Sequence, residues 1–269
     1  MSEPNTTPYF EVRDLTKIYA SADGPVRALD RVSFAQNKGE FVSLVGPSGC
    51  GKSTMMMIAA GLLEHSNGQV EVEGRPVTSA RSDIGIVFQS HVLLDWRTVL
   101  GNVLLQAEAR GMDMAQAERR ARALLKSVGL EGFEKKYPGQ LSGGMRQRVS
   151  ICRALLHEPP HLLMDEPFGA LDALTRDQLT LDLQRMVAER DMTVTFITHS
   201  IPEAVFLSDR VVVMTPRPGK IDKVIDIDIP RPRRLAARGT AEFAEYCRQI
   251  LEVFLESGVI REEDQRLAS

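Results

Sequence analysis

The chain has 269 residues, and 43% of them are hydrophobic, which is enough apolar material for a sizeable core and excludes a disordered chain. The formal net charge is −3, so the composition gives no general attraction to nucleic acid, whose binders usually carry a basic face. The three scattered cysteines, Cys50, Cys152 and Cys247, indicate neither a disulfide framework nor a metal site and suit a reducing compartment.

The N-terminal segment and the longest apolar run both predict a chain that does not itself enter a membrane. Met1–Glu11 is polar and lacks the apolar centre of a secretory signal. The longest strongly apolar stretch, Met55–Leu63, is far shorter than the roughly twenty residues of a membrane-spanning helix. We therefore expect a cytosolic protein whose membrane association comes through a partner.

Strand-like runs alternate with longer helical patterns along most of the chain. The expected strands are Phe10–Tyr19, Arg31–Ala35, Phe41–Val45, Gln69–Val72, Ile84–Phe88, His161–Asp165, Thr193–Thr198 and Arg210–Met214. Several are nearly continuous in apolar residues, as strands of a parallel sheet buried on both faces are. Helical patterns follow the third, sixth and seventh of these runs, which predicts an α/β layered core.

Two segments depart from this alternation. Between Val99 and Leu156 the strand pattern stops and helix-forming residues dominate, which predicts a helical insertion at about residues 97–156 of a main domain spanning residues 10–229. The tail, residues 230–269, begins with a proline-punctuated basic stretch at residues 230–234 and continues as an amphipathic helix. We interpret the arginines as a solvated linker in preference to a contact with anionic lipid headgroups.

A glycine-rich loop lies between the expected strand Phe41–Val45 and a helical run from Met55. It matches G-x-x-x-x-G-K-[ST] and consists of Gly46, Pro47, Ser48, Gly49, Cys50, Gly51, Lys52, Ser53 and Thr54. Inward-facing backbone N–H groups and a helix N-terminus form a cradle for a polyphosphate, with Lys52 expected on the β- and γ-phosphates and the Ser53 hydroxyl on Mg²⁺. The loop alone indicates a nucleoside triphosphate and leaves kinases, GTPases and ATPases open.

Two adjacent carboxylates end the apolar strand His161–Asp165. Asp165 suits a direct or indirect Mg²⁺ role, and Glu166 can accept a proton from an attacking water. An acidic residue often merely ends a strand, but a second carboxylate able to activate water favours hydrolysis over transfer to an acceptor, which a kinase would need.

The segment Leu141-Ser142-Gly143-Gly144-Met145 precedes this acidic pair, and together with the phosphate loop it closely resembles the ABC transporter ATPases, whose signature reads LSGGQ. The resemblance covers roughly residues 10 to 220. It implies a P-loop NTPase fold: a mainly parallel sheet flanked by helices, an N-terminal antiparallel β subdomain and an inserted α-helical subdomain. It also implies ATP and Mg²⁺ as cofactors and argues against a P-loop kinase.

The resemblance assigns roles to four further residues. It implies that Tyr19 stacks on adenine, that Gln89 contacts Mg²⁺, the attacking water and the permease, that Asp172 lies in a loop crossing a dimer interface, and that His199 contacts the γ-phosphate. Without it, Tyr19 is equally an ordinary aromatic at a strand end, His199 a surface histidine at the start of a helix near Ser200, and Asp172 a helix N-cap.

A second anion-binding helix end is indicated at Ser142, Gly143 and Gly144, which precede a helical run. The family resemblance implies that Ser142 and Gly144 of one subunit close over ATP held by the phosphate loop of the other, in a twofold homodimer. Met145 stands where the family usually has Gln, which removes a side-chain amide but leaves the hydroxyl and backbone amides.

Met145, together with the segment Leu93 to Leu100 after Gln89, resembles the branch that imports nitrate, sulfonates, taurine and related small solutes, although Asp95 stands where that branch often has Pro. This implies integral-membrane permease subunits as partners, an extracytoplasmic solute-binding protein indirectly, no nucleic acid, and a peripheral location on the cytoplasmic face of the inner (plasma) membrane. Trp96 is then expected to be an exposed permease contact, the alternative being an ordinary core anchor.

Two questions stay open from the sequence. A soluble ABC ATPase acting on ribosomes or nucleic acid remains a second possible function, although such proteins usually fuse two cassettes or insert long coiled coils. At Cys50, the loop amides predict a lowered thiol pKa and alkylation that ATP blocks, whereas the alternative is an inert small residue chosen to fit the loop.

Overall fold

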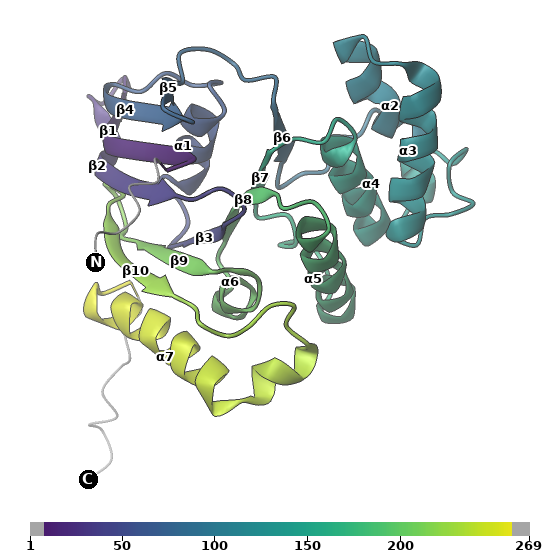
Figure 1. Cartoon of the computed structure of the whole chain (residues 1–269). Coiled ribbons are helices and arrows are strands. Elements are labelled where there is room, and N and C mark those ends of the chain that lie inside the picture. Colours follow the sequence, from purple (N-terminus) through teal and green to yellow (C-terminus); the bar gives the residue numbers. More distant parts are fainter. Residues whose placement is uncertain (1–7, 260–269) are drawn as a thin grey trace, which may run out of the picture. The chain divides into compact units, whose positions relative to one another are not determined.

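The computed structural model describes residues 8–259. Two predictions fall partly outside this range. The N-terminal segment that was expected not to be a secretory signal includes residues 1–7, and the predicted tail includes residues 260–269. Contacts divide the chain into two compact units. The first contains the described parts of residues 1–37, 42–80 and 198–269, and the second contains residues 38–41 and 81–197. Figure 1 labels their elements.

The first unit contains an antiparallel sheet and three strands of a mixed sheet. The antiparallel sheet has the order β2-β1-β4-β5, formed by Val26–Gln36, Phe10–Tyr19, Asn67–Val72 and Arg75–Pro76. In the mixed sheet, β3 (Phe41–Val45) pairs in parallel with β9 (Arg210–Met214), and β10 (Ile221–Asp226) pairs antiparallel to β9. The helices of this unit are α1 (Lys52–Ala59), α6 (Ile201–Leu207), η2 (Leu235–Gly239) and α7 (Ala241–Glu256).

The second unit combines three parallel strands with a helical region. β7 (His161–Asp165) pairs in parallel with β6 (Ile84–Val87) on one side and β8 (Thr193–Thr198) on the other. The helices are α2 (Val99–Arg110), α3 (Met114–Ser127), η1 (Pro138–Gln140), α4 (Gly143–Leu155) and α5 (Ala173–Ala188). α2, α3 and α4 contact one another and stand together in Figure 1.

Local sequence explains why these elements form where they do. β8 is buried along its whole length, as its continuous apolar and threonine sequence predicts. Thr98 and Asp113 cap the N-termini of α2 and α3 by accepting hydrogen bonds from Gly101 and Gln116. Gly111 ends α2 in the left-handed conformation, with φ 64°, which other residues adopt only at a cost.

The structure confirms the predicted α/β fold class and most of the predicted strands. The first discrepancy is β10, which was not predicted as a strand and in which apolar and charged residues do not alternate. The second is β2, which begins at Val26 and not at Arg31, because it continues along β1. The region expected to be a helical insertion holds α2, α3, η1 and α4, while the exact domain boundaries stay predictions.

The interpretation of residues 230–234 as a solvated linker is wrong for Arg233. Its side chain is 2% exposed and donates hydrogen bonds to backbone carbonyls of the first unit. Arg231 is exposed but forms an ion pair with Asp209 at 2.8 Å. Among residues 8–259, none of the helices has the length and apolar character needed to cross a bilayer.

Candidate nucleotide site

The phosphate loop connects β3 to α1 in the first unit. Gly49 and Gly51 both adopt left-handed backbone conformations, with φ 74° and 101°. A Cβ at Gly51 would lie 2.6 Å from the Leu29 side chain and 3.0 Å from the Ala28 carbonyl oxygen, so both the backbone angle and the space require glycine there. α1 begins directly after Gly51, so its free N–H groups lie at the end of the loop.

Lys52 is the first residue of α1, and its side chain turns back into the loop. The ammonium Nζ lies 2.8 Å from the Gly46 carbonyl oxygen and 3.0 Å from that of Pro47, although the side chain is only 5% exposed. A nearly buried ammonium beside neutral acceptors is stabilised by an anionic ligand. Ser48, Gly49 and Ser53 are exposed on the loop. The cradle therefore fits a polyphosphate, as the sequence predicts.

Cys50 contradicts the prediction of a reactive thiol. Its side chain is fully buried, and burial raises the pKa of the thiol, although Lys52 acts in the opposite direction. The Lys52 ammonium lies 3.8 Å from Sγ. Desolvation therefore outweighs the loop amides and the neighbouring charge, and the interpretation as a small residue that fits the loop is the better one.

Tyr19 ends β1 close to the phosphate loop. Its hydroxyl lies 3.3 Å from Thr54 Oγ1, and Lys17 Nζ lies 5.1 Å from the centre of its ring. The ring is 38% exposed, so it is not an ordinary core residue. Its position beside α1 agrees with adenine stacking, which stays a prediction.

His199 lies between the end of β8 and the start of α6. The helix cap is Ser200, whose hydroxyl accepts a hydrogen bond from Glu203 N at 3.4 Å. The buried Thr198 hydroxyl donates to the Glu203 carboxylate at 2.7 Å, which fixes the turn on the other side of His199. His199 itself is exposed. The cap function therefore belongs to Ser200, and a phosphate contact by His199 stays a prediction.

The predicted hydrolytic residues of the second unit follow adjacent strands. Gln89 follows β6 and Glu166 follows β7, and the Gln89 amide Nε2 donates to Glu166 Oε2 at 3.1 Å. Glu166 has a left-handed backbone with φ 44°, a strained conformation for a side chain other than glycine, and its N–H donates to the Ile197 carbonyl at 2.9 Å. Asp165, the last residue of β7, is half-buried beside it.

Ser142 begins α4, as the expected second anion site requires. Its hydroxyl accepts a hydrogen bond from Met145 N at 3.3 Å and keeps its own proton for another acceptor. Gly143 faces open space, whereas a Cβ at Gly144 would lie 2.4 Å from Thr175 Cγ2. Gly144 therefore also serves the close packing of α4 on α5.

Asp172 is the N-cap of α5. Its carboxylate accepts a hydrogen bond from Thr175 N at 3.0 Å, and bonding to the Thr175 backbone lowers the pKa of the Asp172 carboxyl. The cap interpretation is confirmed. A role at a dimer interface is compatible with it and stays a prediction. The predicted site residues thus form two groups: Tyr19, the phosphate loop and His199 in the first unit, and the others in the second.

The donor set fits ATP and Mg²⁺. Mg²⁺ in nucleotide sites takes one or two carboxylates, with phosphate oxygens and water completing its ligands. Within the described residues there is no cluster of three or more histidine, cysteine and acidic side chains that could hold a metal ion without a ligand. The residues expected at the ion are Ser53, Gln89 and Asp165, a hydroxyl, an amide and a carboxylate, which together are typical of an ion that arrives with the nucleotide.

Sequence reasoning missed the residues that hold the segment around Trp96. The fully buried Asn102 accepts from Leu94 N at 2.7 Å and places Nδ2 3.0 Å from the carbonyls of Leu94, Arg97 and Thr98. The guanidinium of Arg153 donates to the carbonyls of His91 and Val92. An asparagine within a helical pattern next to a loop is the only local signal that could have indicated this.

Trp96 itself is 76% exposed, so its interpretation as a core anchor is wrong. Leu93 and Leu94 are half-buried and Val99 is buried, which attaches the segment to the second unit. The indole thus projects from a loop that buried hydrogen bonds keep in shape.

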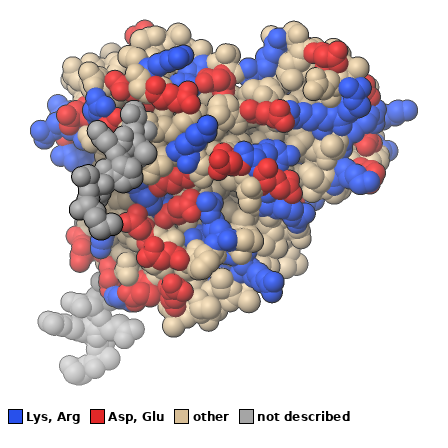
Figure 2. Space-filling view, in the orientation of Figure 1, with Lys and Arg blue, Asp and Glu red and all other residues tan. Residues whose placement is uncertain are grey.

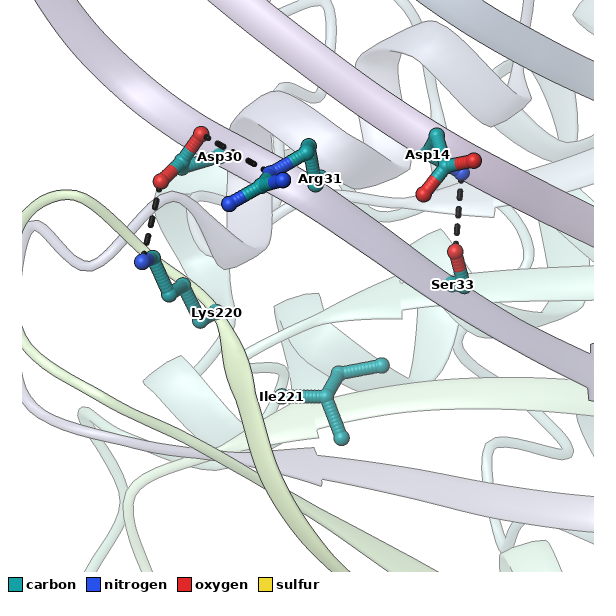
Figure 3. A pocket seen from close by; sticks show the side chains of 6 residues that line it. All are labelled: Asp14, Asp30, Arg31, Ser33, Lys220 and Ile221. Carbon is teal, nitrogen blue, oxygen red and sulfur yellow. Dashed lines mark hydrogen bonds and ion pairs between the residues drawn. The ribbon is translucent and has the colours of Figure 1, made fainter.

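A polar hollow of about 370 Å³ lies elsewhere in the first unit (Figure 3). Asp30 in it lies 3.0 Å from Lys220 Nζ and 4.0 Å from Arg31 Nε, and the hydrogen bond from Lys220 lowers the pKa of Asp30. Asp14 and Ser33 line it too. Its acids and bases balance, so it offers no net charge to a phosphate and does not compete with the loop as a nucleotide site.

Comparison with known proteins gives one family. The family model described as ABC transporter matches residues 29–169. An uncharacterised ABC transporter ATP-binding protein of Methanocaldococcus jannaschii is 46% identical over 90% of this chain and 90% of its own. The aliphatic sulfonates import ATP-binding protein of Bacillus cereus is 39% identical over 93% of this chain and 97% of its own. The bicarbonate transport ATP-binding protein of Synechocystis is 43% identical over 86% of this chain and 83% of its own.

Solved structures agree with these sequences. A dimeric ATP-binding cassette in a post-hydrolysis state, bound to ADP and Pi, superposes with a TM-score of 0.74 and 32% identity, covering 82% of this chain and 100% of its own. The dimeric structure of a bacterial ABC transporter cassette matches with the same TM-score, 33% identity and the same coverage.

Proposed function

This chain belongs to the ABC transporter ATP-binding family, and on that premise we propose that it drives the import of a small anionic solute through a separately encoded permease. As a member of the family it is an ATPase that binds ATP with Mg²⁺.

The chemistry follows from the side chains. The loop amides and the Lys52 ammonium bind the phosphates and stabilise the charge that develops on them. Glu166 accepts a proton from the attacking water, and Gln89, which donates to its carboxylate at 3.1 Å, holds it in place. When bound, Mg²⁺ neutralises charge between the phosphate oxygens. Its ligands would be Ser53, Gln89 and Asp165, and His199 contacts the γ-phosphate.

A homodimer completes the site in this proposal. Ser142 and the N–H groups at the start of α4 form a second anion-binding helix end, for which a single subunit with its own phosphate loop has no evident need. In an isologous dimer, each Ser142 would contact the ATP held by its partner, and the Asp172 loop would cross the interface. The two solved cassettes to which this chain is similar are dimeric.

The exposed Trp96 is the single observation that carries the assignment to a transporter. Trp96 is 76% exposed on a loop that the buried Asn102 keeps in shape. Exposing a large apolar side chain to water is unfavourable for an enzyme that acts alone, but such a side chain is a suitable anchor for a partner protein. Gln89 lies at the start of the same segment and contacts Glu166. A permease helix bound at Trp96 would thus be linked to the catalytic carboxylate within one unit.

The proposed solute class rests on the relatives. Proteins named for aliphatic sulfonate import and bicarbonate transport resemble nearly the whole chain, and both solutes are small anions. Nitrate, sulfonates and taurine are the candidates implied by residues 93–100. An extracytoplasmic solute-binding protein would deliver the solute, and the subunit would lie peripherally on the cytoplasmic face of the inner (plasma) membrane.

The alternative is an ABC ATPase that acts on nucleic acid or ribosomes. The formal net charge is −3, and acidic and basic side chains are interspersed on the face drawn in Figure 2. On that face, basic side chains do not form the continuous patch to which nucleic-acid phosphates bind. Charge therefore favours the transporter.

The test is purification of the intact complex from membranes with a tagged subunit. ATP hydrolysis by the complex in liposomes is then measured with its solute-binding protein and a panel of nitrate, taurine, an alkanesulfonate and bicarbonate. We expect an apolar permease to copurify and one of these anions to stimulate hydrolysis. Copurification of ribosomes or nucleic acid without a membrane protein would support the alternative.

A further inference from the structure

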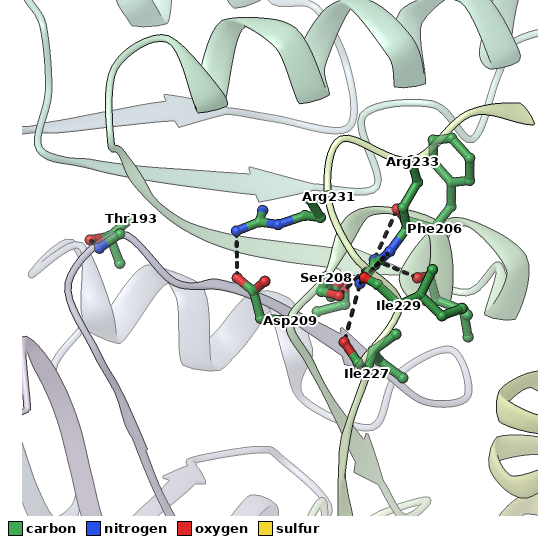
Figure 4. A network of polar contacts seen from close by, with 11 residues as sticks. Thr193, Phe206, Ser208, Asp209, Ile227, Ile229, Arg231 and Arg233 are labelled. Atoms are coloured by element: carbon green, nitrogen blue, oxygen red, sulfur yellow. Dashed lines mark hydrogen bonds and ion pairs between the residues drawn. The ribbon is translucent and has the colours of Figure 1, made fainter. Parts of the chain in front are cut away.

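Arg233 lies in the tail of the chain, yet it is among the most buried charged residues of the first unit. Its guanidinium donates hydrogen bonds to several backbone carbonyls (Figure 4). Nη1 lies 2.8 Å, 3.0 Å and 2.8 Å from the carbonyl oxygens of Val205, Phe206 and Ser208. Nε and Nη2 bind the Ile229 carbonyl, and Nη2 also binds that of Ile227.

These acceptors connect the tail to the C-terminal end of α6. Val205 and Phe206 belong to the last turn of α6, whose carbonyls have no partner within the helix. α6 has no basic residue of its own in that turn. Arg233 therefore supplies both the donors and the positive charge that a helix C-terminus favours. Burial lowers the pKa of Arg233 to about 10, which leaves the guanidinium charged at neutral pH.

Two neighbours reinforce the attachment. Arg231 forms an ion pair with Asp209 at 2.8 Å, directly after the Ser208 that Arg233 binds. The Arg238 guanidinium lies 4.9 Å from the centre of the Phe206 ring. Three arginines of one short segment thus contact the last turn of α6 and the two residues that follow the helix.

Both ends of α6 are connected to segments that contain or lead into predicted nucleotide-binding residues. The N-terminus of α6 follows His199, with Ser200 as its cap. The Ser208 hydroxyl lies 2.5 Å from that of Ser43, which belongs to β3, the strand that leads into the phosphate loop. α6 has only seven residues, so a displacement of its C-terminal end changes the position of its N-terminal end.

We propose that Arg233 is a positioning residue for ATP hydrolysis, which fixes α6 and thereby the position of His199 directly before it. This inference rests on the proposed contact of His199 with the γ-phosphate. It makes the tail up to Arg238 part of the ATPase machinery and not an appendage. Lysine cannot replace the arginine, because one ammonium cannot bind carbonyls on both sides of a planar fork.

The experiment compares Arg233→Lys with Arg234→Gln in the full-length chain. Arg234 is the adjacent arginine and is exposed, so it serves as the matched control. We expect Arg233→Lys to lower kcat for ATP at least about tenfold, to leave the Kd for a fluorescent ATP analogue within about twofold, and to increase amide hydrogen exchange in residues 201–208. Arg234→Gln should match the wild type in all three.

A double-mutant cycle with His199→Ala separates positioning from a general loss of structure. If Arg233 acts through His199, the substitution Arg233→Lys has little further effect on kcat in the His199→Ala background. Full additivity, or an Arg233→Lys variant as active as the control, overturns the inference. If His199→Ala itself hydrolyses ATP normally, the proposed role of His199 is wrong instead.

Arg238→Gln covers the case in which Arg233→Lys does not fold. This change removes the contact with the Phe206 ring of α6, the helix that Arg233 also binds. We expect a smaller fall in kcat that is also non-additive with His199→Ala. Additivity in this second cycle would overturn the inference as well.

Discussion

The Gln89 side-chain amide donates a hydrogen bond to the Glu166 carboxylate at 3.1 Å. The two residues are 77 positions apart in sequence and meet because β6 and β7 are parallel neighbours whose carboxyl ends lie at one edge. The left-handed backbone at Glu166 turns its side chain out of the strand direction. Because Gln89 donates through a neutral amide, it orients the Glu166 carboxylate without neutralising its charge, as a general base requires.

Glu166→Gln tests that role. We expect it to slow ATP hydrolysis roughly a hundredfold or more, because the amide cannot accept a proton from water, while ATP binding stays within about twofold. With ATP and Mg²⁺ the variant should accumulate as a dimer, seen as doubled mass by light scattering. Glu131→Gln, which changes an exposed carboxylate of the same unit, is the control. Near-normal ATP turnover by Glu166→Gln would show that Glu166 is not the general base.

Lys52→Ala should act on binding itself. Removing an ammonium that makes charge-assisted hydrogen bonds to phosphate costs roughly 1.5–3 kcal/mol, so we expect the Kd for ATP to rise about tenfold or more. Lys38→Ala removes an exposed charge and should leave the Kd unchanged. Isothermal titration of both variants measures this, and equal affinities would show that Lys52 does not hold the phosphates.

The three cysteines should react in order of burial. The pKa of Cys152 is raised to about 12 by complete burial, that of Cys50 is raised by burial in the phosphate loop, and Cys247 is only half-buried. Because the thiolate is the reactive form, iodoacetamide should label Cys247 first and Cys152 last in the folded protein. Peptide mass spectrometry over time gives the order. Fast labelling of Cys50 that ATP blocks would restore the prediction made from its loop.

The phosphate loop could be predicted from sequence because its chemistry is local. Consecutive residues from Gly46 to Thr54 supply the glycines, the amides and the ammonium, and the flanking strand and helix follow from their apolar patterns. The cap by Asp172 was predictable for the same reason. The Gln89–Glu166 contact was not predicted. The family resemblance relates both residues to the attacking water, but nothing near either residue indicates that β6 and β7 are neighbours.

The features that were missed depend on contacts between distant segments. Cys50 was misjudged because the amides of its loop are visible in the sequence, whereas its burial is not. Arg233 was misjudged because arginines in a proline-punctuated stretch usually face solvent, and its carbonyl partners come together only when the tail packs on α6. For β10, the apolar residues Ile221, Val224 and Ile225 do not alternate with the charged residues, so the period-two signal of a strand is weak, and the pairing with β9 is visible only in the fold.

Stability should fall in mild acid through His161. Burial lowers its pKa from 6.5 to about 3, and its Nε2 lies 2.9 Å from Thr195 Oγ1. Between those pH values the unfolded chain binds a proton that the folded chain does not. The stabilisation is therefore complete above about pH 6.5 and is lost as the pH falls, by up to about 1.4 kcal/mol per pH unit.

The measurement for His161 is urea unfolding at pH 7.5 and pH 5. His161→Gln removes the titrating group, so it should lose less stability between these two pH values than the wild type does. Equal losses in both proteins would assign the acid sensitivity to other groups.

Trp96→Ala tests whether this chain binds a permease through Trp96. Because the side chain is 76% exposed and Asn102 keeps its loop in shape, the isolated variant should keep its thermal unfolding temperature within about 2 °C and its affinity for ATP. Met114→Ala removes another exposed apolar side chain of the same unit and is the control.

The decisive measurement is copurification of the permease from membranes with each tagged variant, together with solute uptake by the same cells. We predict that the wild type and Met114→Ala retain the permease and transport solute. With Trp96→Ala, the amount of permease that copurifies should fall at least about tenfold, and uptake should be abolished. Full complex formation and normal uptake with Trp96→Ala would contradict the account.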